Sequence, residues 1–147
     1  MNDLIQIALT QYGVKEIQGA EANNPEIIKY FAACGQMWAK TDETSWCSAF
    51  VNWCAIGTGH EHTRKLDARS WLKIGEPIEK FQHAGDIVVL WRVSRQDWRG
   101  HVGIYVNEDD ENIWILGGNQ SNSVCIKPYP KSRLLGYRRL KHDRYNT

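Results

Sequence analysis

The hydrophobic pattern of this chain changes its period at Pro77. Before that residue, apolar side chains recur at the three- and four-residue spacing of amphipathic helices. After it they occur in short runs separated by turn residues. Helices followed by strands predict an α+β domain, in which N-terminal helices pack on a C-terminal antiparallel β-sheet. At 147 residues the chain is most simply one domain over residues 1–147.

Four helices are predicted from the apolar spacing and from the residues that start and stop each helix. The second has Asn24 as its N-cap and Pro25 as its first residue, an arrangement typical of helix starts. The third begins near Cys47, where a polar stretch becomes apolar. Glycines follow the predicted ends. The expected ranges are 3–12, 25–35, 47–56 and 67–73.

Five strands are predicted after the change of period. Their roughly regular spacing, with turn residues between them, favours an antiparallel meander. We interpret residues 117–122, which begin with two glycines, as a break that ends the third strand. The expected strands cover 87–91, 102–106, 113–116, 124–126 and 134–140.

Cys47 stands at the predicted start of the third helix. A thiol in the first turn of a helix lies at the positive end of the helix dipole, close to backbone N–H groups. Both features favour the thiolate, which is the nucleophilic form. The sequence therefore offers Cys47 as a candidate nucleophile.

His101 and Asn119 are the candidate partners of this thiol. If Val102 and Ile104 face the core, strand alternation places His101 on the opposite face. In an antiparallel pair the start of one strand lies beside the end of the next, so Asn119 can be a neighbour of His101. An amide oxygen that accepts a hydrogen bond from the imidazole would orient the ring toward the thiol.

Each of these residues also has a simpler interpretation when it is taken alone. Cys47 can be a structural thiol, His101 a surface or capped residue, and the segment before Asn119 a turn. The remaining cysteines lie in apolar surroundings and are interpreted as buried, inert thiols. No disulfide framework, metal site or cofactor is expected from the cysteine and histidine spacing. These other cysteines are Cys34, Cys54 and Cys125.

The charge and composition exclude several classes of partner. A net charge of +1 gives no argument for nucleic acid, and the longest aliphatic-aromatic run, Ile87 to Trp91, is too short for membrane insertion. Seven Trp fit either a binding groove or ordinary packing. Basic residues near the C-terminus are interpreted mostly as solvated edge-strand charge. These are Lys131, Arg133, Arg138, Arg139, Lys141 and Arg144.

Several segments, in the right order over roughly residues 5–140, resemble the CHAP and NlpC/P60-type cysteine peptidases. The segment around Cys47 resembles their nucleophile helix, and the segment that starts at Gly100 resembles their histidine motif. The early segments and the closing strand resemble a compact bacterial and phage branch of this group. The resembling segments are Tyr12–Glu16, Asn23–Pro25, Trp46–Cys54, Gly85–Leu90, Gly100–Tyr105, Leu116–Gln120 and Leu135–Arg138.

The resemblance implies a papain-like NlpC/P60-CHAP fold and cleavage of an amide bond in the peptidoglycan stem peptide. It assigns Cys47 as the nucleophile, His101 as general base and then acid, and Asn119 as the residue that orients His101. One departure concerns Gly117, which stands where CHAP members often carry a glutamate two positions before this asparagine. A backbone carbonyl or a distant acid is the alternative orienting group.

Two other functions compatible with these residues are a non-catalytic module that binds glycan or protein, and a thiol acyltransferase or deamidase acting on protein. The N-terminus shows neither a basic nor an apolar signal region. We therefore expect synthesis in the cytoplasm without a signal peptide, and action at the cell wall or periplasm after export. The protein is then either a secretion-system effector with a cognate immunity protein, or a phage lysin released through a holin.

Overall fold

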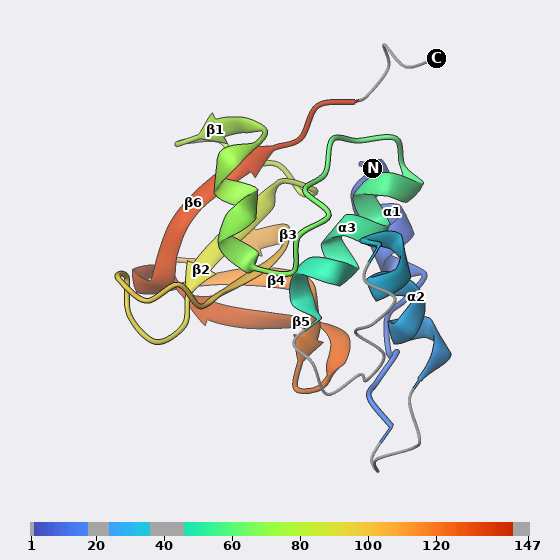
Figure 1. Ribbon diagram of the computed structural model, residues 1–147. Helices are drawn as coiled ribbons and strands as arrows, with labels where there is room; N and C mark the ends of the chain where they lie inside the picture. The colour runs from blue at the N-terminus through green and yellow to red at the C-terminus, as the bar shows by residue number, and fades with distance from the viewer. Residues whose placement is uncertain (1, 18–23, 36–45, 143–147) are drawn as a thin grey trace.

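Three α-helices from the first half of the chain pack beside a six-stranded sheet (Figure 1). The computed structural model describes residues 2–17, 24–35 and 46–142. The helices are α1 (Asp3–Leu9), α2 (Pro25–Ala33) and α3 (Cys47–Gly57), and the short 3₁₀ helix η1 (Ala68–Lys73) follows them. Within the described ranges, no helix is long and apolar enough to cross a bilayer.

The predicted helix starts are confirmed, whereas the first two helices end earlier than predicted and the fourth differs in type. The side-chain oxygen of Asn24 accepts a hydrogen bond from the Glu26 N–H at 2.9 Å and caps α2, and α3 begins at Cys47. The first helix is shorter than predicted, because turns follow Leu9 up to Gly13. The fourth is a 3₁₀ helix rather than an α-helix.

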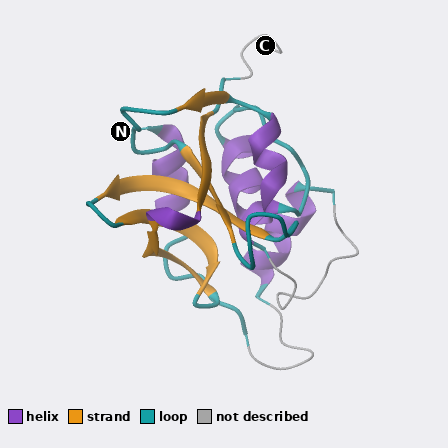
Figure 2. Ribbon diagram, turned by 90° about the vertical axis from the view of Figure 1, so that its left-hand side faces the viewer, coloured by secondary structure: helices purple, strands orange, loops and turns teal. Residues whose placement is uncertain are grey.

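The sheet confirms the predicted antiparallel meander only in part. Its strand order is β1-β6-β2-β3-β4-β5, so the four strands β2 to β5 form the meander. The sequence placed the last strand, β6, at the far end of the meander, which is wrong, because β6 pairs with β2 on the side opposite β3. Strand β1 was not predicted. Figure 2 shows the curvature of these strands. Their bounds are β1 (Glu76–Ile78), β2 (Ile87–Trp91), β3 (Gly100–Glu108), β4 (Asn112–Gln120), β5 (Ser123–Pro130) and β6 (Leu134–Arg139).

The predicted break in the third strand of the meander is wrong. Strand β4 continues to Gln120 through a shift of register that begins after Gly117, and Asn119 adopts a left-handed φ of 58° within it. Gly118 allows this segment to approach α3, because a Cβ at that position would lie 2.6 Å from the Trp46 ring.

Each face of the sheet carries its own apolar cluster. Val102 and Ile104 belong to the cluster that includes the helices, whereas Tyr105 belongs to the cluster on the opposite face. His101 pairs across the ladder with Leu90, a member of that second cluster. The alternation predicted for β3 is thus confirmed, and it directs His101 away from the helix-facing core.

None of the four cysteines forms a disulfide. Cys47 begins a helix as predicted. Cys34 and Cys54 are buried as predicted, and burial raises the pKa of the Cys34 thiol to about 11. Burial also raises the pKa of Cys54. The prediction for Cys125 is wrong, because this thiol is half-buried on an edge strand of the sheet, β5.

Asn52 ties α3 to the loop that precedes η1. Its side chain is fully buried, and its oxygen accepts hydrogen bonds from the N–H groups of Thr63 at 3.0 Å and Arg64 at 2.8 Å. Asn52→Leu should lower the free energy of unfolding by about 2 to 4 kcal/mol, because it leaves two N–H groups unsatisfied. Urea unfolding measures this loss. The exposed Asn107 provides the matched control, and equal midpoints for Asn52→Leu and Asn107→Leu would contradict the assignment.

Candidate active site

Cys47 is the first residue of α3, and its side chain is 3% exposed. The residue before it anchors the helix start. The indole of Trp46 is fully buried, donates a hydrogen bond to a carboxylate oxygen of Glu16 at 2.9 Å, and stacks on Tyr30 with 6.0 Å between ring centroids. The contacts of Trp46 therefore hold the start of α3 in place. The Cys47 thiol lies at this helix start, where the helix dipole favours a thiolate.

His101 is held by a hydrogen bond to Gln120. Nε2 of the imidazole lies 2.8 Å from Oε1 of Gln120, and both side chains are buried. The amide nitrogen of Gln120 donates to the carbonyl oxygens of Ile115 at 3.1 Å and Cys125 at 2.7 Å. These contacts fix which end of the amide faces the histidine. Because an amide oxygen only accepts, His101 donates from Nε2, and Nδ1 is the nitrogen left to act as a base.

Asn119 lies near His101, as predicted, since both line one pocket together with Cys47. His101 makes a hydrogen bond with the next residue, Gln120, and the orienting role of Asn119 stays a prediction. The register shift in β4 rotates the chain, so that Gln120 points at the imidazole. A Cβ at Gly117 would lie 2.6 Å from Oε1 of Gln120, so a glutamate at that position would collide with the amide found here.

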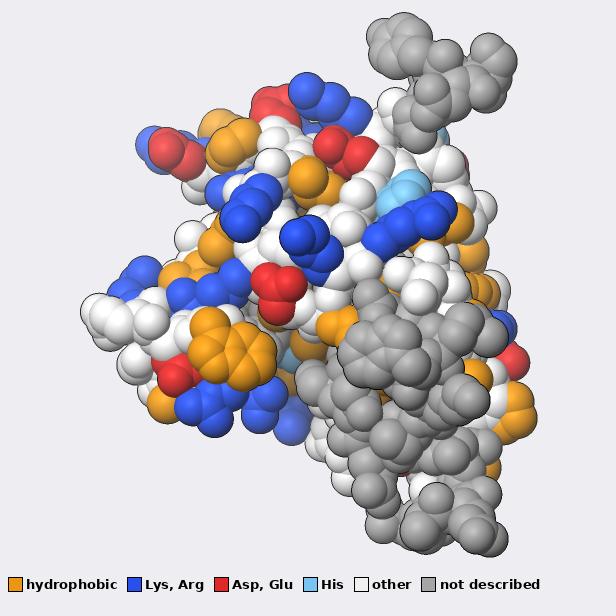
Figure 3. All heavy atoms as spheres, in the orientation of Figure 1, with side chains coloured by type: hydrophobic (Ala, Val, Ile, Leu, Met, Phe, Trp, Pro, Cys, Tyr) orange, Lys and Arg blue, Asp and Glu red, His pale blue; other side chains and the backbone are white. Residues whose placement is uncertain are grey.

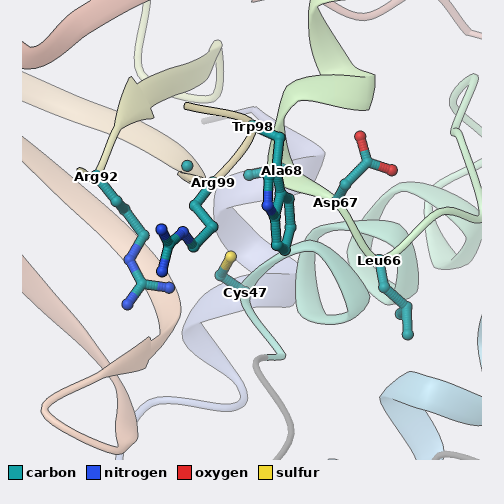
Figure 4. A pocket seen from close by; sticks show the side chains of 8 residues that line it. Cys47, Leu66, Asp67, Ala68, Arg92, Trp98 and Arg99 are labelled. Carbon is teal, nitrogen blue, oxygen red and sulfur yellow. The ribbon is translucent and has the colours of Figure 1, made fainter. Parts of the chain in front are cut away.

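Two adjoining pockets meet at Cys47. The polar pocket has a volume of about 130 Å³ and contains the histidine. The apolar pocket is larger, at about 250 Å³, and extends toward η1 and the β2–β3 loop (Figure 4). Cys47 and Arg92 line both. The polar pocket is lined by Cys47, Arg92, His101, Asn119, Tyr129 and Arg133. The apolar pocket is lined by Cys47, Leu66, Asp67, Ala68, Arg92, Trp98, Arg99 and Gly100.

Trp98 is an exposed aromatic residue beside the thiol. Its side chain is 71% exposed, and Figure 4 shows its indole extending along the wall of the apolar pocket toward Cys47. Lys and Arg side chains gather around an exposed hydrophobic group on the face that carries the β2–β3 loop (Figure 3). Exposed aromatic surface in a cleft is typical of a binding site, because it offers apolar area that a ligand can cover.

The β2–β3 loop that carries Trp98 is fastened by Arg69 of η1. The guanidinium of Arg69 donates to the carbonyl oxygens of Ser94 at 3.0 Å and Arg95 at 2.8 Å. It also reaches the carbonyl of Arg99 at 3.2 Å. These hydrogen bonds fix the backbone of the loop, while the side chain of Trp98 remains accessible.

Sequence reasoning missed four residues around His101, one of which is Tyr129, whose ring stacks on the imidazole. Gln120 was assigned to a turn, and only the register shift gives it its direction. No sequence motif marked Arg92 as a pocket residue. Arg133 was interpreted as solvated charge, yet it lines the polar pocket. Arg144 of the same basic run lies outside the described residues.

The arrangement defines a class of protein. A thiol at the head of a helix, packed against an antiparallel sheet that carries a buried, oriented histidine, is the arrangement that papain-like cysteine peptidases use. The model of the CHAP domain family matches residues 39–119, more than half of the chain, and the chain belongs to the CHAP family. CHAP domains are typically cysteine- and histidine-dependent amidases or peptidases, which indicates a peptidoglycan hydrolase of amidase type. A search of curated proteins found no match.

Proposed function

We propose that this protein hydrolyses an amide bond of the peptidoglycan stem peptide, with Cys47 as nucleophile, His101 as base and acid, and Gln120 as the residue that positions His101. The observation that carries the proposal is the 2.8 Å contact between His101 and Gln120 beside the pocket of Cys47. It orients a buried imidazole in the tautomer that can accept a proton from a thiol.

Acylation begins when Nδ1 of His101 takes the proton of the Cys47 thiol. The thiolate attacks the carbonyl carbon, and the oxyanion that forms is stabilised by the backbone N–H of Cys47, since N–H groups of a first helical turn point out of the helix end. His101 then gives its proton to the amide nitrogen. The C–N bond breaks, the amine leaves, and the acyl group stays on sulfur as a thioester.

Deacylation repeats these roles with water. His101 takes a proton from a water molecule, the resulting hydroxide attacks the thioester carbon, and the C–S bond breaks. The thiolate recovers its proton, and the product is a carboxylic acid. Gln120 touches neither substrate nor sulfur in this scheme. It acts by keeping the imidazole in one orientation through both steps.

Digestion of purified sacculi tests the class of bond. After incubation with the protein, mass spectrometry of the soluble muropeptides should reveal new pairs of amine and carboxylate ends. The positions of these ends identify the bond, either the lactyl–L-Ala amide or a peptide bond in the stem or cross-bridge. New reducing sugar ends would assign glycan cleavage and contradict the proposal, as would the absence of any new fragment.

Thiol labelling separates the enzyme from a binding module with an inert Cys47. At neutral pH, iodoacetamide should modify Cys47 at least ~10-fold faster than the half-buried Cys125, because thiolate character controls alkylation. Cys34 and Cys54 should react slowly, because burial raises the pKa of both thiols and neither lines the pockets at Cys47. Peptide mapping over time measures the rates. His101→Ala should slow the labelling of Cys47 and leave that of Cys125 unchanged, and faster labelling of Cys125 in the wild type would favour the binding module.

An acyltransferase or deamidase acting on protein would use the same residues, so only substrate profiling distinguishes it from a wall hydrolase. Turnover of protein glutamine or protein thioesters, without release of muropeptides, would favour this rival. Delivery to the wall, by a secretion system or through a holin, stays a prediction from the sequence. Co-purification of a small inhibitor from the producing cell would favour an effector with an immunity protein.

A further inference from the structure

The polar pocket beside Cys47 contains two arginines that the catalytic scheme does not use. Arg133 is half-buried and held in place. Its Nε donates to the carbonyl oxygen of Trp91 at 3.0 Å, and its guanidinium lies over the rings of Tyr129 at 5.5 Å and Trp91 at 5.9 Å. This packing fixes the plane of the guanidinium. Arg92 is exposed and lines both pockets.

The charge of these two arginines is not compensated within the pocket. Among the described residues, neither arginine takes part in an ion pair, whereas the nearby Arg99 is paired with Asp97 at 2.8 Å. None of the six residues that line the polar pocket is acidic. Two cations in a small hollow without a carboxylate of the protein offer a site for an anion of the ligand.

Tyr129 lines the polar pocket together with both arginines. Burial raises the pKa of this tyrosine, and the positive charges of Arg133 and Arg92 oppose that rise. The ring of Tyr129 stacks on His101 with 5.1 Å between centroids. An anion held by the arginines would therefore lie close to the catalytic histidine and thiol.

We propose that Arg92 and Arg133 bind a carboxylate of the peptide whose amide Cys47 attacks. The planar guanidinium presents parallel N–H donors that match the two oxygens of a carboxylate. Because the pocket is only about 130 Å³ and includes Cys47, the anion belongs to the same molecule as the scissile amide, within a residue or two of it. This inference rests on the proposed function, and it adds a substrate requirement: a free carboxylate beside the bond that is cleaved.

The two pockets then divide the substrate between them. The carboxylate side occupies the polar pocket, and the less polar part of the substrate covers Trp98 and Leu66 in the apolar pocket. Arg92, which borders both, stands where the two parts join at Cys47. In a muramyl tripeptide the free carboxylates are those of the γ-linked D-glutamate and of the C-terminal diamino acid, and either has the required chemistry.

Three synthetic muramyl peptides test the proposal. The first keeps every carboxylate free, the second has the D-glutamate carboxylate converted to an amide, and the third has the carboxylates of the diamino acid converted to amides. Wild type should lose about 10- to 100-fold in kcat/KM on one of the two amidated peptides, mainly through KM, because charge-assisted hydrogen bonds are lost. The peptide that is affected identifies which carboxylate binds.

Substitution of each arginine tests whether it causes the preference for the peptide with the free carboxylate. Arg92→Gln and Arg133→Gln should each lower kcat/KM for the free peptide and reduce its advantage over the amidated one to about threefold or less, since a neutral amide no longer discriminates charge. Arg95→Gln is the matched control, because Arg95 is exposed on the same loop, lines neither pocket and should keep the full preference. Arg92 is exposed, so its substitution should leave the fold intact, as a thermal melt will verify.

The outcomes are separable. Equal cleavage of all three peptides by wild type, or a preference that survives in both Arg92→Gln and Arg133→Gln, would overturn the carboxylate site and leave the proposed hydrolase intact. Failure of wild type to cleave any of the peptides, together with failure to digest sacculi, would instead remove the proposed function itself.

Discussion

Cys47→Ala should lower the rate of muropeptide release from sacculi by at least ~10³-fold, since the members of a nucleophile–base unit do not act independently. The thiol stands at the first residue of α3 and lines both pockets, whereas the methyl group of alanine can form no thioester. The rate is measured from the appearance of amine ends over time. Cys47→Ser should be nearly as inactive, because a hydroxyl in this site lacks the low-energy anion of a thiol.

Cys125→Ala is the matched control for that loss. Among the described cysteines Cys125 alone is not buried, and its thiol donates to the Gln120 carbonyl at 3.4 Å. Its removal should change the rate by less than about tenfold, since the amide of Gln120 keeps its stronger bonds to backbone carbonyls. A Cys47→Ala variant that is folded and retains wild-type activity would exclude Cys47 as the nucleophile.

Gln120→Met should lower kcat by about 10² to 10⁴-fold and leave KM almost unchanged, because methionine fills the same space but offers no oxygen to orient His101. The side chain of Gln120 is 1% exposed, contacts the imidazole of His101 and is not among the residues that line the polar pocket. Steady-state kinetics on a defined muropeptide separates kcat from KM. A rise in KM alone would instead place Gln120 in substrate binding.

Two further variants distinguish a positioning role from a structural one. Gln120→Glu keeps an acceptor for His101 and should recover part of the activity. The acidic limb of its pH–rate profile should move to higher pH, because a carboxylate stabilises the imidazolium and His101 must be neutral to accept a proton. Asn119→Ala should cost less than Gln120→Met. The opposite order would return the orienting role to Asn119, as the sequence predicted.

The sequence predicted those parts of the site that depend on local pattern. The start of α3 at Cys47 follows from the change of a polar run into an apolar one, and the direction of His101 follows from alternation along β3. Both are fixed by neighbours in the chain. The order of Cys47 before His101 is likewise a property of the sequence itself.

The parts that could not be predicted depend on long-range packing. The pairing of β6 with β2 could not be predicted, because the residue pattern of a strand does not specify which strand it pairs with. The register shift after Gly117 exchanges the directions of Asn119 and Gln120, since one extra residue turns every later side chain to the other face. Arg133 became a pocket residue only because Trp91 and Tyr129 pack against it.

The most direct test of the central claim, that Cys47 carries the acyl group as a thioester, is interception by hydroxylamine during digestion of a muropeptide. The nitrogen of hydroxylamine attacks the thioester carbon and displaces the thiolate, so wild-type protein should release fragments that end in a hydroxamate. The share of these fragments should rise with hydroxylamine concentration, as mass spectrometry will measure. Fragments that end only in carboxylate, at concentrations that intercept a known thiol peptidase run in parallel, would mean that water attacks the amide directly and would contradict the account.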